Sequence, residues 1–123
     1  MSEASELLER YSQNLLGKPS LNEMATIVPK SMGFGIELKI FSEDHNPAHI
    51  HVYDINSGNL IAKIIIPSSK PSNVNSIRVY EDEELTITQK KLILKVLNAK
   101  DRKTGTPVWK TAIIVWDSLH YDD

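Results

Sequence analysis

Apolar and polar residues alternate through the middle of the chain. Isoleucine and leucine occupy every second position over 36–40, and two further alternating runs follow over 49–53 and 60–66. Successive side chains of a strand point to opposite faces of a sheet, so each run predicts a strand with one buried face. A shorter alternation over 77–80 predicts a fourth strand. We therefore expect residues 25–80 to form a small antiparallel sheet of three or four strands.

The run 60–66 differs from the others because isoleucines occupy both of its faces. Ala62 and Ile64 lie on one predicted face, while Ile61 and Ile65 lie on the other. A strand that is covered above and below is apolar on both faces. We therefore expect 60–66 to be the central strand of the sheet.

The repeat changes to helical spacing near the N-terminus. Apolar residues recur every three or four positions over 3–16, and Gly17 then supplies a stop signal. This pattern predicts an N-terminal helix within an extension of residues 1–19. Residues 20–33 fit either a short helix that ends at Pro29 or a packed connection.

Helical spacing returns over residues 87–121, where we expect two helices. Thr88 is the expected N-cap of the first helix, and Thr106 is that of the second, with Pro107 at its first helical position. The spacing predicts that the last helix buries Trp109, Ala112, Ile113, Trp116 and Leu119. Strands first and helices afterwards favour an α+β fold, with the helices packed on one side of the sheet.

Composition fits a single globular domain that spans residues 1–123. The chain is 41% hydrophobic and 24% charged, and a chain of this length can fold without a metal or a disulfide. The absence of cysteine excludes a disulfide framework, a thiolate zinc site and a cysteine nucleophile. No apolar run resembles a secretory signal or a membrane span, so we expect a cytoplasmic protein without membrane contact.

Charge is unevenly distributed, although the formal net charge is only -2. Between positions 90 and 110 there are seven basic residues and one acidic residue. A basic segment can attract nucleic acid, but lysines opposite an apolar stripe are also what a solvated helix face shows. We favour the solvated face, and the acidic net charge argues against a dedicated nucleic-acid coat.

Three of the four histidines fall within the nine residues 44–52. His49 and His51 are two positions apart in a predicted strand, so their imidazoles project from the same face. Histidine is the commonest metal ligand, and such a pair can share a divalent ion such as zinc or manganese. The same pair also suits a polar face without a ligand, because Ile50 and Val52 take the buried positions. Both interpretations remain open.

Asp44, His45 and His120 complete the set of candidate site residues. Asp44 and His45 lie in a predicted loop, where Asp44 can support a histidine or simply cap the turn. His120 lies near the end of the last predicted helix, where the helix dipole favours a protonated imidazole, and it joins the site only if that helix reaches the sheet. In an enzyme, His45, His49 and His51 would be the catalytic candidates, supported by Asp44 and His120.

Several enzyme classes lack their motifs in this sequence. It has no phosphate-binding glycine loop, no His-Glu-x-x-His helix and no Gly-x-Ser-x-Gly elbow. Tyr53 stands where a histidine-triad hydrolase would continue its alternating histidines. A cupin metal site would need a glutamate shortly after the histidine pair, and none occurs from Tyr53 to Ala62.

The segment 44–52 reads Asp-His-Asn-Pro-Ala-His-Ile-His-Val. Together with the apolar strand before it, this segment resembles the Asp-His-x-Pro-x-His-x-His-Val pattern of a family of small, mostly bacterial proteins, domain of unknown function 4160. The resemblance covers residues 25–66, and Trp116 and His120 resemble a tryptophan and a histidine that follow on a helix in that family. The N-terminal residues, the loop 67–75 and the longer helical tail depart from the family pattern.

The resemblance implies no established activity. Members of the family are associated with toxin–antitoxin or mobile-element gene pairs, which implies a protein partner encoded nearby and leaves the oligomeric state open. Association of this kind does not supply a mechanism.

Three hypotheses about function follow. The first is a small binding or regulatory module that acts as one partner of a toxin–antitoxin-like pair. The second is a metal- or histidine-dependent enzyme that acts on phosphodiesters. The third makes the histidine cluster a satisfied polar network without a catalytic role.

Overall fold

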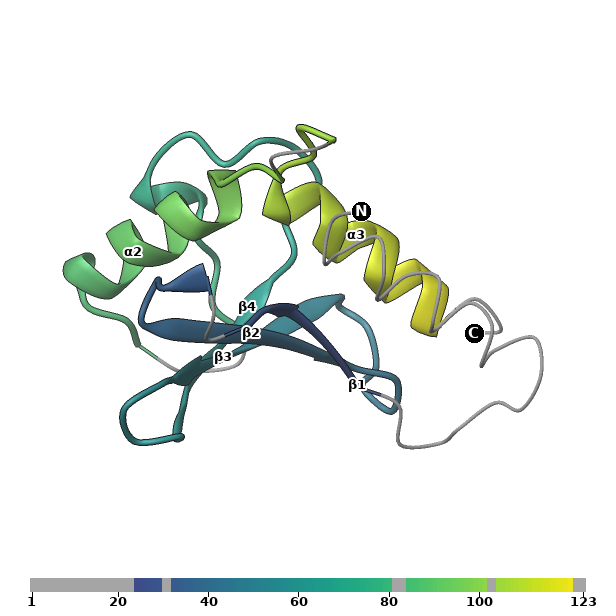
Figure 1. The fold of residues 1–123 in the computed structure, drawn as a ribbon, viewed down its shortest axis with the longest axis horizontal. Helices are drawn as coiled ribbons and strands as arrows, with labels where there is room; N and C mark the ends of the chain where they lie inside the picture. Colours follow the sequence, from purple (N-terminus) through teal and green to yellow (C-terminus); the bar gives the residue numbers. More distant parts are fainter. Residues whose placement is uncertain (1–23, 30–31, 81–83, 102–103, 121–123) are drawn as a thin grey trace.

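The computed structural model describes residues 24–29, 32–80, 84–101 and 104–120. Within these residues, a sheet of four antiparallel strands is followed by two helices, which confirms the predicted α+β fold (Figure 1). The helix predicted within residues 1–19 lies outside the described residues. No helix in the described part of the chain is both long and apolar enough to cross a membrane.

The sheet is an antiparallel meander in which each strand pairs with the next one along the chain. Its strands are β1 (Met24–Val28), β2 (Ile36–Phe41), β3 (His49–Asp54) and β4 (Leu60–Ile65). The three alternating runs of the sequence correspond to β2, β3 and β4, as predicted. Short connections let these consecutive strands pair and bury the same face, which places every second residue in the core.

β1 corrects the expectation of a short helix or a packed connection within residues 20–33. It runs antiparallel to β2, with Ala25 opposite Ile40. Ala25 and Ile27 are buried, and pairing with β2 satisfies main-chain polar groups that an irregular connection would leave without partners. The free energy gained from pairing and burial therefore outweighs any helical preference of this segment.

β4 is the last strand of the sheet, so the expectation that residues 60–66 form the central strand is wrong. The fourth strand predicted over 77–80 is reduced to a single bridge, between Ile64 and Val79. Ile61 and Ile65 are half-buried on the second face of β4. Apolar residues on both faces of a strand indicate that other residues cover it above and below. Such cover does not require a neighbouring strand on each side.

α2 (Ile87–Asn98) takes Thr86 as its N-cap instead of the predicted Thr88. The Thr86 hydroxyl accepts a hydrogen bond from the Gln89 backbone N–H at 3.1 Å, and the Gln89 side-chain oxygen accepts one from the Thr86 backbone N–H at 2.9 Å. This reciprocal capping box satisfies two N–H groups at the start of the helix. Thr88 cannot form one because the residue three positions later, Lys91, has no acceptor.

α3 (Val108–Leu119) takes Pro107 as its N-cap, so the helix begins one residue later than predicted. Pro107 is held in an extended conformation by a β-bridge to Lys100. The helix buries three of the five predicted residues, which are Ala112, Trp116 and Leu119. The other two, Trp109 and Ile113, are only half-buried, because the buried stripe runs instead through Val108, Thr111 and Val115.

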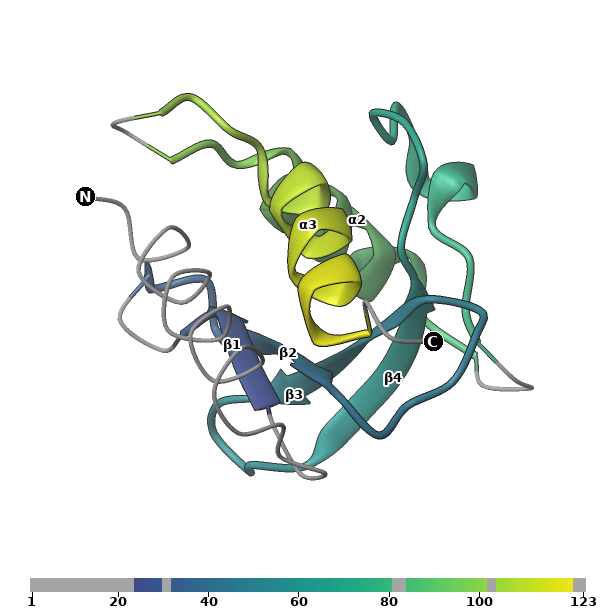
Figure 2. The same ribbon diagram turned by 90° about the vertical axis from the view of Figure 1, so that its right-hand side faces the viewer.

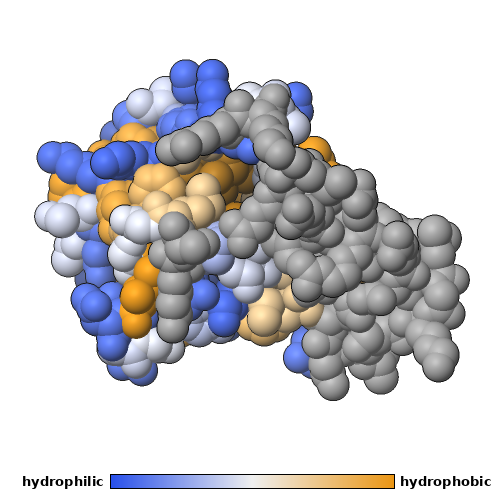
Figure 3. Space-filling model, viewed as in Figure 1, coloured by the Kyte–Doolittle hydropathy of each residue, from blue (hydrophilic) through white to orange (hydrophobic). Residues whose placement is uncertain are grey.

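The core lies between the sheet and the two helices, which cover one face of the sheet (Figures 1 and 2). Figure 3 shows hydrophobic residues in the layer between the helices and the sheet and hydrophilic ones along the outer edge of α2. The largest fully buried side chains are Leu38, Ile40, Ile50, Ile64, Leu97, Val28, Val52, Val96 and Val115. Each such side chain contributes about 1.5–3 kcal/mol when it leaves water, so this layer is the main source of stability.

The loop between β2 and β3 and the C-terminal end of α3 meet at one end of the sheet (Figure 2). Nε2 of His120, the C-cap of α3, lies 2.9 Å from the backbone oxygen of Asp44 in that loop. The loop is therefore held between the sheet and the last helix. This contact positions the candidate site.

Candidate metal centre

Asp44, His49 and His51 come together at this end of the sheet. One potential ligand atom from each residue lies within 4.8 Å of the other two. Oδ2 of Asp44 is 2.8 Å from Nε2 of His51 and 3.3 Å from Nε2 of His49. Two imidazoles and a carboxylate are donors that divalent transition metals accept. These three residues therefore form a group that could hold a metal ion.

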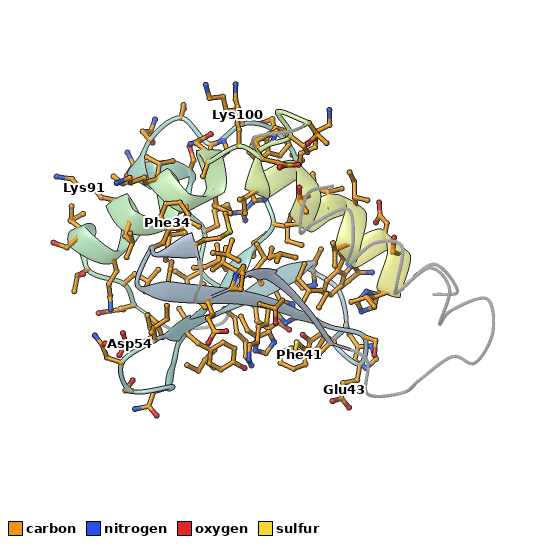
Figure 4. The ribbon with its side chains drawn as sticks, in the orientation of Figure 1. Phe34, Phe41, Glu43, Asp54, Lys91 and Lys100 are labelled. Carbon is orange, nitrogen blue, oxygen red and sulfur yellow. The ribbon has the colours of Figure 1, made fainter. Side chains whose placement is uncertain are left out.

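The local sequence explains how the three side chains meet. His49 and His51 are alternate residues of β3 and project from the same face, as predicted. After β2 the chain turns, and the backbone N–H of Asp44 donates to the carbonyl oxygen of Phe41 at 3.4 Å. Figure 4 shows Phe41 on the sheet face opposite the helices and Glu43 pointing away at the outer end of the loop. The turn thus returns Asp44 to the histidine face.

His49 is oriented by the loop that precedes it. Its Nδ1 lies 2.9 Å from the carbonyl oxygen of Pro47. A carbonyl oxygen only accepts hydrogen bonds, so Nδ1 carries the hydrogen and Nε2 of the neutral ring carries the lone pair. Metal-binding histidines are commonly held in this way, with the second nitrogen bonded to a carbonyl or a carboxylate.

The pKa of His51 depends on its burial and on the charges around it. Burial lowers the pKa of His51 below its ordinary value, while the hydrogen bond and negative charge of Asp44 act in the opposite direction. Electrostatic interactions with His49 and Lys63 lower this pKa further. The net result favours the neutral ring, which is the form that binds metal ions.

His49 is buried, with 3% of its surface exposed, although the strand pattern predicts that it lies on a polar face. The ring of Tyr80 stacks on it with centroids 4.4 Å apart and planes 1° from parallel. The Trp116 ring lies 5.6 Å away. Side chains from a distant loop and from α3 therefore cover a residue that would otherwise face solvent.

His120 reaches the site but does not join the ligand group. Its Nδ1 lies 2.8 Å from the carbonyl oxygen of Trp116, and its Nε2 lies 2.9 Å from that of Asp44. The ring also stacks on Trp116, with centroids 3.9 Å apart. Both nitrogens face carbonyl oxygens, which only accept hydrogen bonds, so each nitrogen is placed to donate one. His120 therefore holds the backbone of Asp44 and leaves the metal group to three residues.

His45 is exposed on the loop and lies outside the group of three. The structure thus brings Asp44, His49 and His51 together, places His120 against the backbone behind them, and leaves His45 apart. A catalytic role for any of these residues stays a prediction.

Two lysines of the predicted basic segment, Lys91 and Lys100, lie on the helix side of the sheet, away from Phe41 (Figure 4). Lys91, Lys95, Lys100 and Lys110 are exposed, and the first two lie on α2, which buries Ile93, Val96 and Leu97 on its other side. This arrangement is that of a solvated helix face. Contact with nucleic acid through the segment stays a prediction.

Three neighbours of the site were not identified from the sequence. Tyr80 covers His49, while Lys39 and Lys63 pair with His51 across the two adjoining strands. The alternating runs place both lysines on polar strand faces, but a single run carries no information about which residue lies opposite. Register between strands therefore had to come from the tertiary structure.

No protein-family model matches the chain, and no curated protein and no solved structure matches it significantly. Membership of the family that segment 44–52 resembles stays a prediction.

Proposed function

We propose that this protein binds one divalent metal ion through Asp44, His49 and His51 and uses it in a metal-dependent reaction. The observation that carries the proposal is the orientation of His49. With its Nδ1 hydrogen directed at Pro47, its Nε2 faces Asp44 Oδ2 at 3.3 Å. Two electron-rich atoms at this distance repel each other unless a cation lies between them, which is either a proton on Nε2 or a metal ion.

The separations of the donor atoms support a metal as this cation. Two ligands of a tetrahedral zinc ion, each about 2.0–2.2 Å from the metal, lie about 3.3–3.5 Å apart. Asp44 Oδ2 and His49 Nε2 are 3.3 Å apart, whereas the 2.8 Å contact between Asp44 and His51 is a hydrogen bond. A metal would replace that hydrogen bond.

The number of protein ligands supports a reactive centre over a purely structural one. Structural zinc sites are closed by four protein ligands, whereas catalytic sites have three and leave a position for water or substrate. Asp44 and His51 retain 20% and 12% exposure of their side chains, against 4% for His49, so access is from their side. When bound, a divalent ion supplies Lewis-acid chemistry at an oxygen of the substrate.

The donor set favours zinc, with manganese as the second candidate. Imidazole nitrogen suits zinc, and the carboxylate of Asp44 is compatible with either ion. With Nε2 of His51 bonded to Asp44, metal binding at Nε2 would require the proton of the neutral ring to move to Nδ1. His49 already has its lone pair in place.

Metal binding is tested by titrating metal-stripped protein without a histidine tag by calorimetry, with zinc and manganese salts. We expect one ion per chain and a more stable fold, with a gain of about 2.7 kcal/mol when free metal reaches a hundred times its dissociation constant. Asp44→Asn and His51→Gln should each abolish tight binding. His45→Gln is the matched control, because His45 is an exposed histidine of the same loop.

Two results would overturn this proposal. One is wild-type protein that binds neither ion, which would leave the group as a polar network of the kind named in the third hypothesis. The other is retention of wild-type affinity in both Asp44→Asn and His51→Gln. The open coordination position is tested separately, because azide added to the cobalt-loaded protein should change its visible spectrum, and a constant spectrum would indicate a closed site.

The regulatory module of the first hypothesis stays a prediction. It rests on the family resemblance of segment 44–52, and no contact described above bears on a protein partner. Metal binding and a regulatory role are compatible, so the experiment above decides the chemistry of the site and not the presence of a partner.

A further inference from the structure

Two lysines flank His51 on the face of the sheet that carries the metal group. Lys39 on β2 and Lys63 on β4 each lie directly opposite His51 on β3. Directly opposed residues of antiparallel strands project to the same face, with Cβ atoms about 4.5–5.5 Å apart. His51 therefore has a side chain bearing an ammonium group on either side.

Aromatic rings hold both ammonium groups close to the sheet. Nζ of Lys39 is 5.1 Å from the centroid of the Tyr53 ring, and Nζ of Lys63 is 5.9 Å from that of Tyr80. The electron-rich face of a ring attracts a cation at such distances. Tyr53 neighbours His51 at a ring separation of 6.3 Å, and Tyr80 stacks on His49. The same rings thus connect the lysines to the two histidines.

The charges on this face suit an anion once a metal is bound. Asp44 supplies one negative charge, which a divalent ion more than cancels. Glu37 lies on the same face, opposite Tyr53 and two register pairs beyond the pair of Lys39 and His51. Lys63 already acts electrostatically on His51. Counted over the described residues alone, the surroundings of His51 would therefore carry a net positive charge in the metal-bound protein.

We infer that Lys39 and Lys63 form a subsite for the phosphate group of a phosphate monoester, which would bridge the lysines and the metal. This inference rests on the proposed function and names its substrate class. A monoester offers three non-bridging oxygens, one for the ion and one for each lysine, whereas a carboxylate and a phosphodiester offer two. Charge-assisted hydrogen bonds to phosphate are among the stronger polar contacts in proteins.

The subsite is tested by calorimetric titration of the zinc-loaded protein with inorganic phosphate, phenyl phosphate and diphenyl phosphate. We expect saturable binding of the first two ligands and weaker binding of the diester. Lys39→Met and Lys63→Met should each weaken phosphate binding about tenfold or more, the loss of one charged hydrogen bond, while both variants still bind zinc. Lys39→Arg should retain phosphate binding.

Lys91→Met is the matched control, because Lys91 is an exposed lysine on α2, on the helix side of the sheet (Figure 4). Wild-type phosphate affinity in a zinc-loaded Lys39→Met/Lys63→Met double variant would overturn the subsite and leave the metal centre standing. Diphenyl phosphate bound as tightly as phenyl phosphate would overturn the preference for a monoester.

A protein that binds no metal would overturn the proposed function, and the lysines can then be examined alone. In metal-free protein, phosphate should still perturb the amide resonances of Lys39 and Lys63 in nuclear magnetic resonance spectra, with lower affinity. Perturbation confined to these strands would support the subsite. If phosphate perturbs these resonances in neither the zinc-loaded nor the metal-free protein, the lysine subsite is overturned.

Discussion

Asp44 is held through two different parts of the residue. Its carboxylate contacts the rings of His49 and His51, and its backbone carbonyl accepts a hydrogen bond from His120. A carboxylate fixed in this way loses little additional freedom when it binds an ion, and preorganisation of this kind increases affinity. At the residue scale, the site therefore depends on the geometry around Asp44 as much as on the presence of two histidines.

His51 makes the stability of the metal-free protein depend on pH. Burial lowers the pKa of His51 in the folded protein below its ordinary value of 6.5, so between these two values the unfolded chain binds more protons than the folded one. The free energy of unfolding therefore rises with pH through this window and decreases as the pH falls below about 6.5. Urea unfolding at about pH 7.5 and about pH 5.5 should show this decrease.

In His51→Gln the decrease should be smaller, because the group that titrates is gone. His45→Gln, which removes an exposed histidine, should leave the decrease unchanged. Equal pH dependence in the wild type and His51→Gln would show that burial of His51 is not its source.

At the scale of single elements, strand geometry places the histidines and helix caps set the ends of the helices. β3 projects His49 and His51 to one face because its side chains alternate. The start of α2 depends on a reciprocal pair of hydrogen bonds that only one of two nearby threonines can form. A difference of two residues in a threonine's position thus decides whether it caps the helix.

Thr86→Ala should destabilise the protein by about 0.5–2 kcal/mol, because it removes the cap of α2. Thr88→Ala, two residues away on the exposed first turn, should change stability by no more than about 0.5 kcal/mol. Urea unfolding of both variants gives the comparison. A larger loss in Thr88→Ala would favour the N-cap predicted from the sequence.

At the scale of the whole molecule, the site joins segments that are far apart in the chain. The hydrogen bond between His120 and Asp44 spans 76 residues, and it connects the end of α3 to the loop between β2 and β3. Tyr80 reaches His49 from the segment after β4. Packing of α3 on the sheet is therefore a condition for the geometry of the metal group.

His120→Phe should weaken metal binding about 10-fold to 100-fold, the usual effect of losing a residue that orients a ligand. The phenyl ring can still stack on Trp116, so the fold should persist, and only the hydrogen bonds to Trp116 and Asp44 are lost. Zinc titration by calorimetry, with thermal unfolding to monitor the fold, measures the effect.

His120→Asn retains a side-chain donor and should recover part of the affinity. Unchanged zinc affinity in His120→Phe would show that the contact stabilises the fold without positioning Asp44.

Features that depend on neighbouring residues can be predicted from the amino-acid sequence alone. Three features follow from the direction of successive side chains along a strand or a helix. They are the alternation of β2, β3 and β4, the α+β order of elements and the shared face of His49 and His51. These directions are set by local backbone geometry, so a short stretch of sequence suffices to predict them.

The identity of the distant segments that meet follows from how the whole chain packs. Four features depend on pairing or packing between segments that are many residues apart. They are the strand conformation of β1, the position of β4 at the end of the sheet, the cover of His49 by Tyr80 and the contact between His120 and Asp44. The free energy of such contacts belongs to two segments jointly and is opposed by the entropy of closing the chain between them. A single stretch of sequence records neither quantity, which is why the site was recognised as a histidine cluster but its geometry was not.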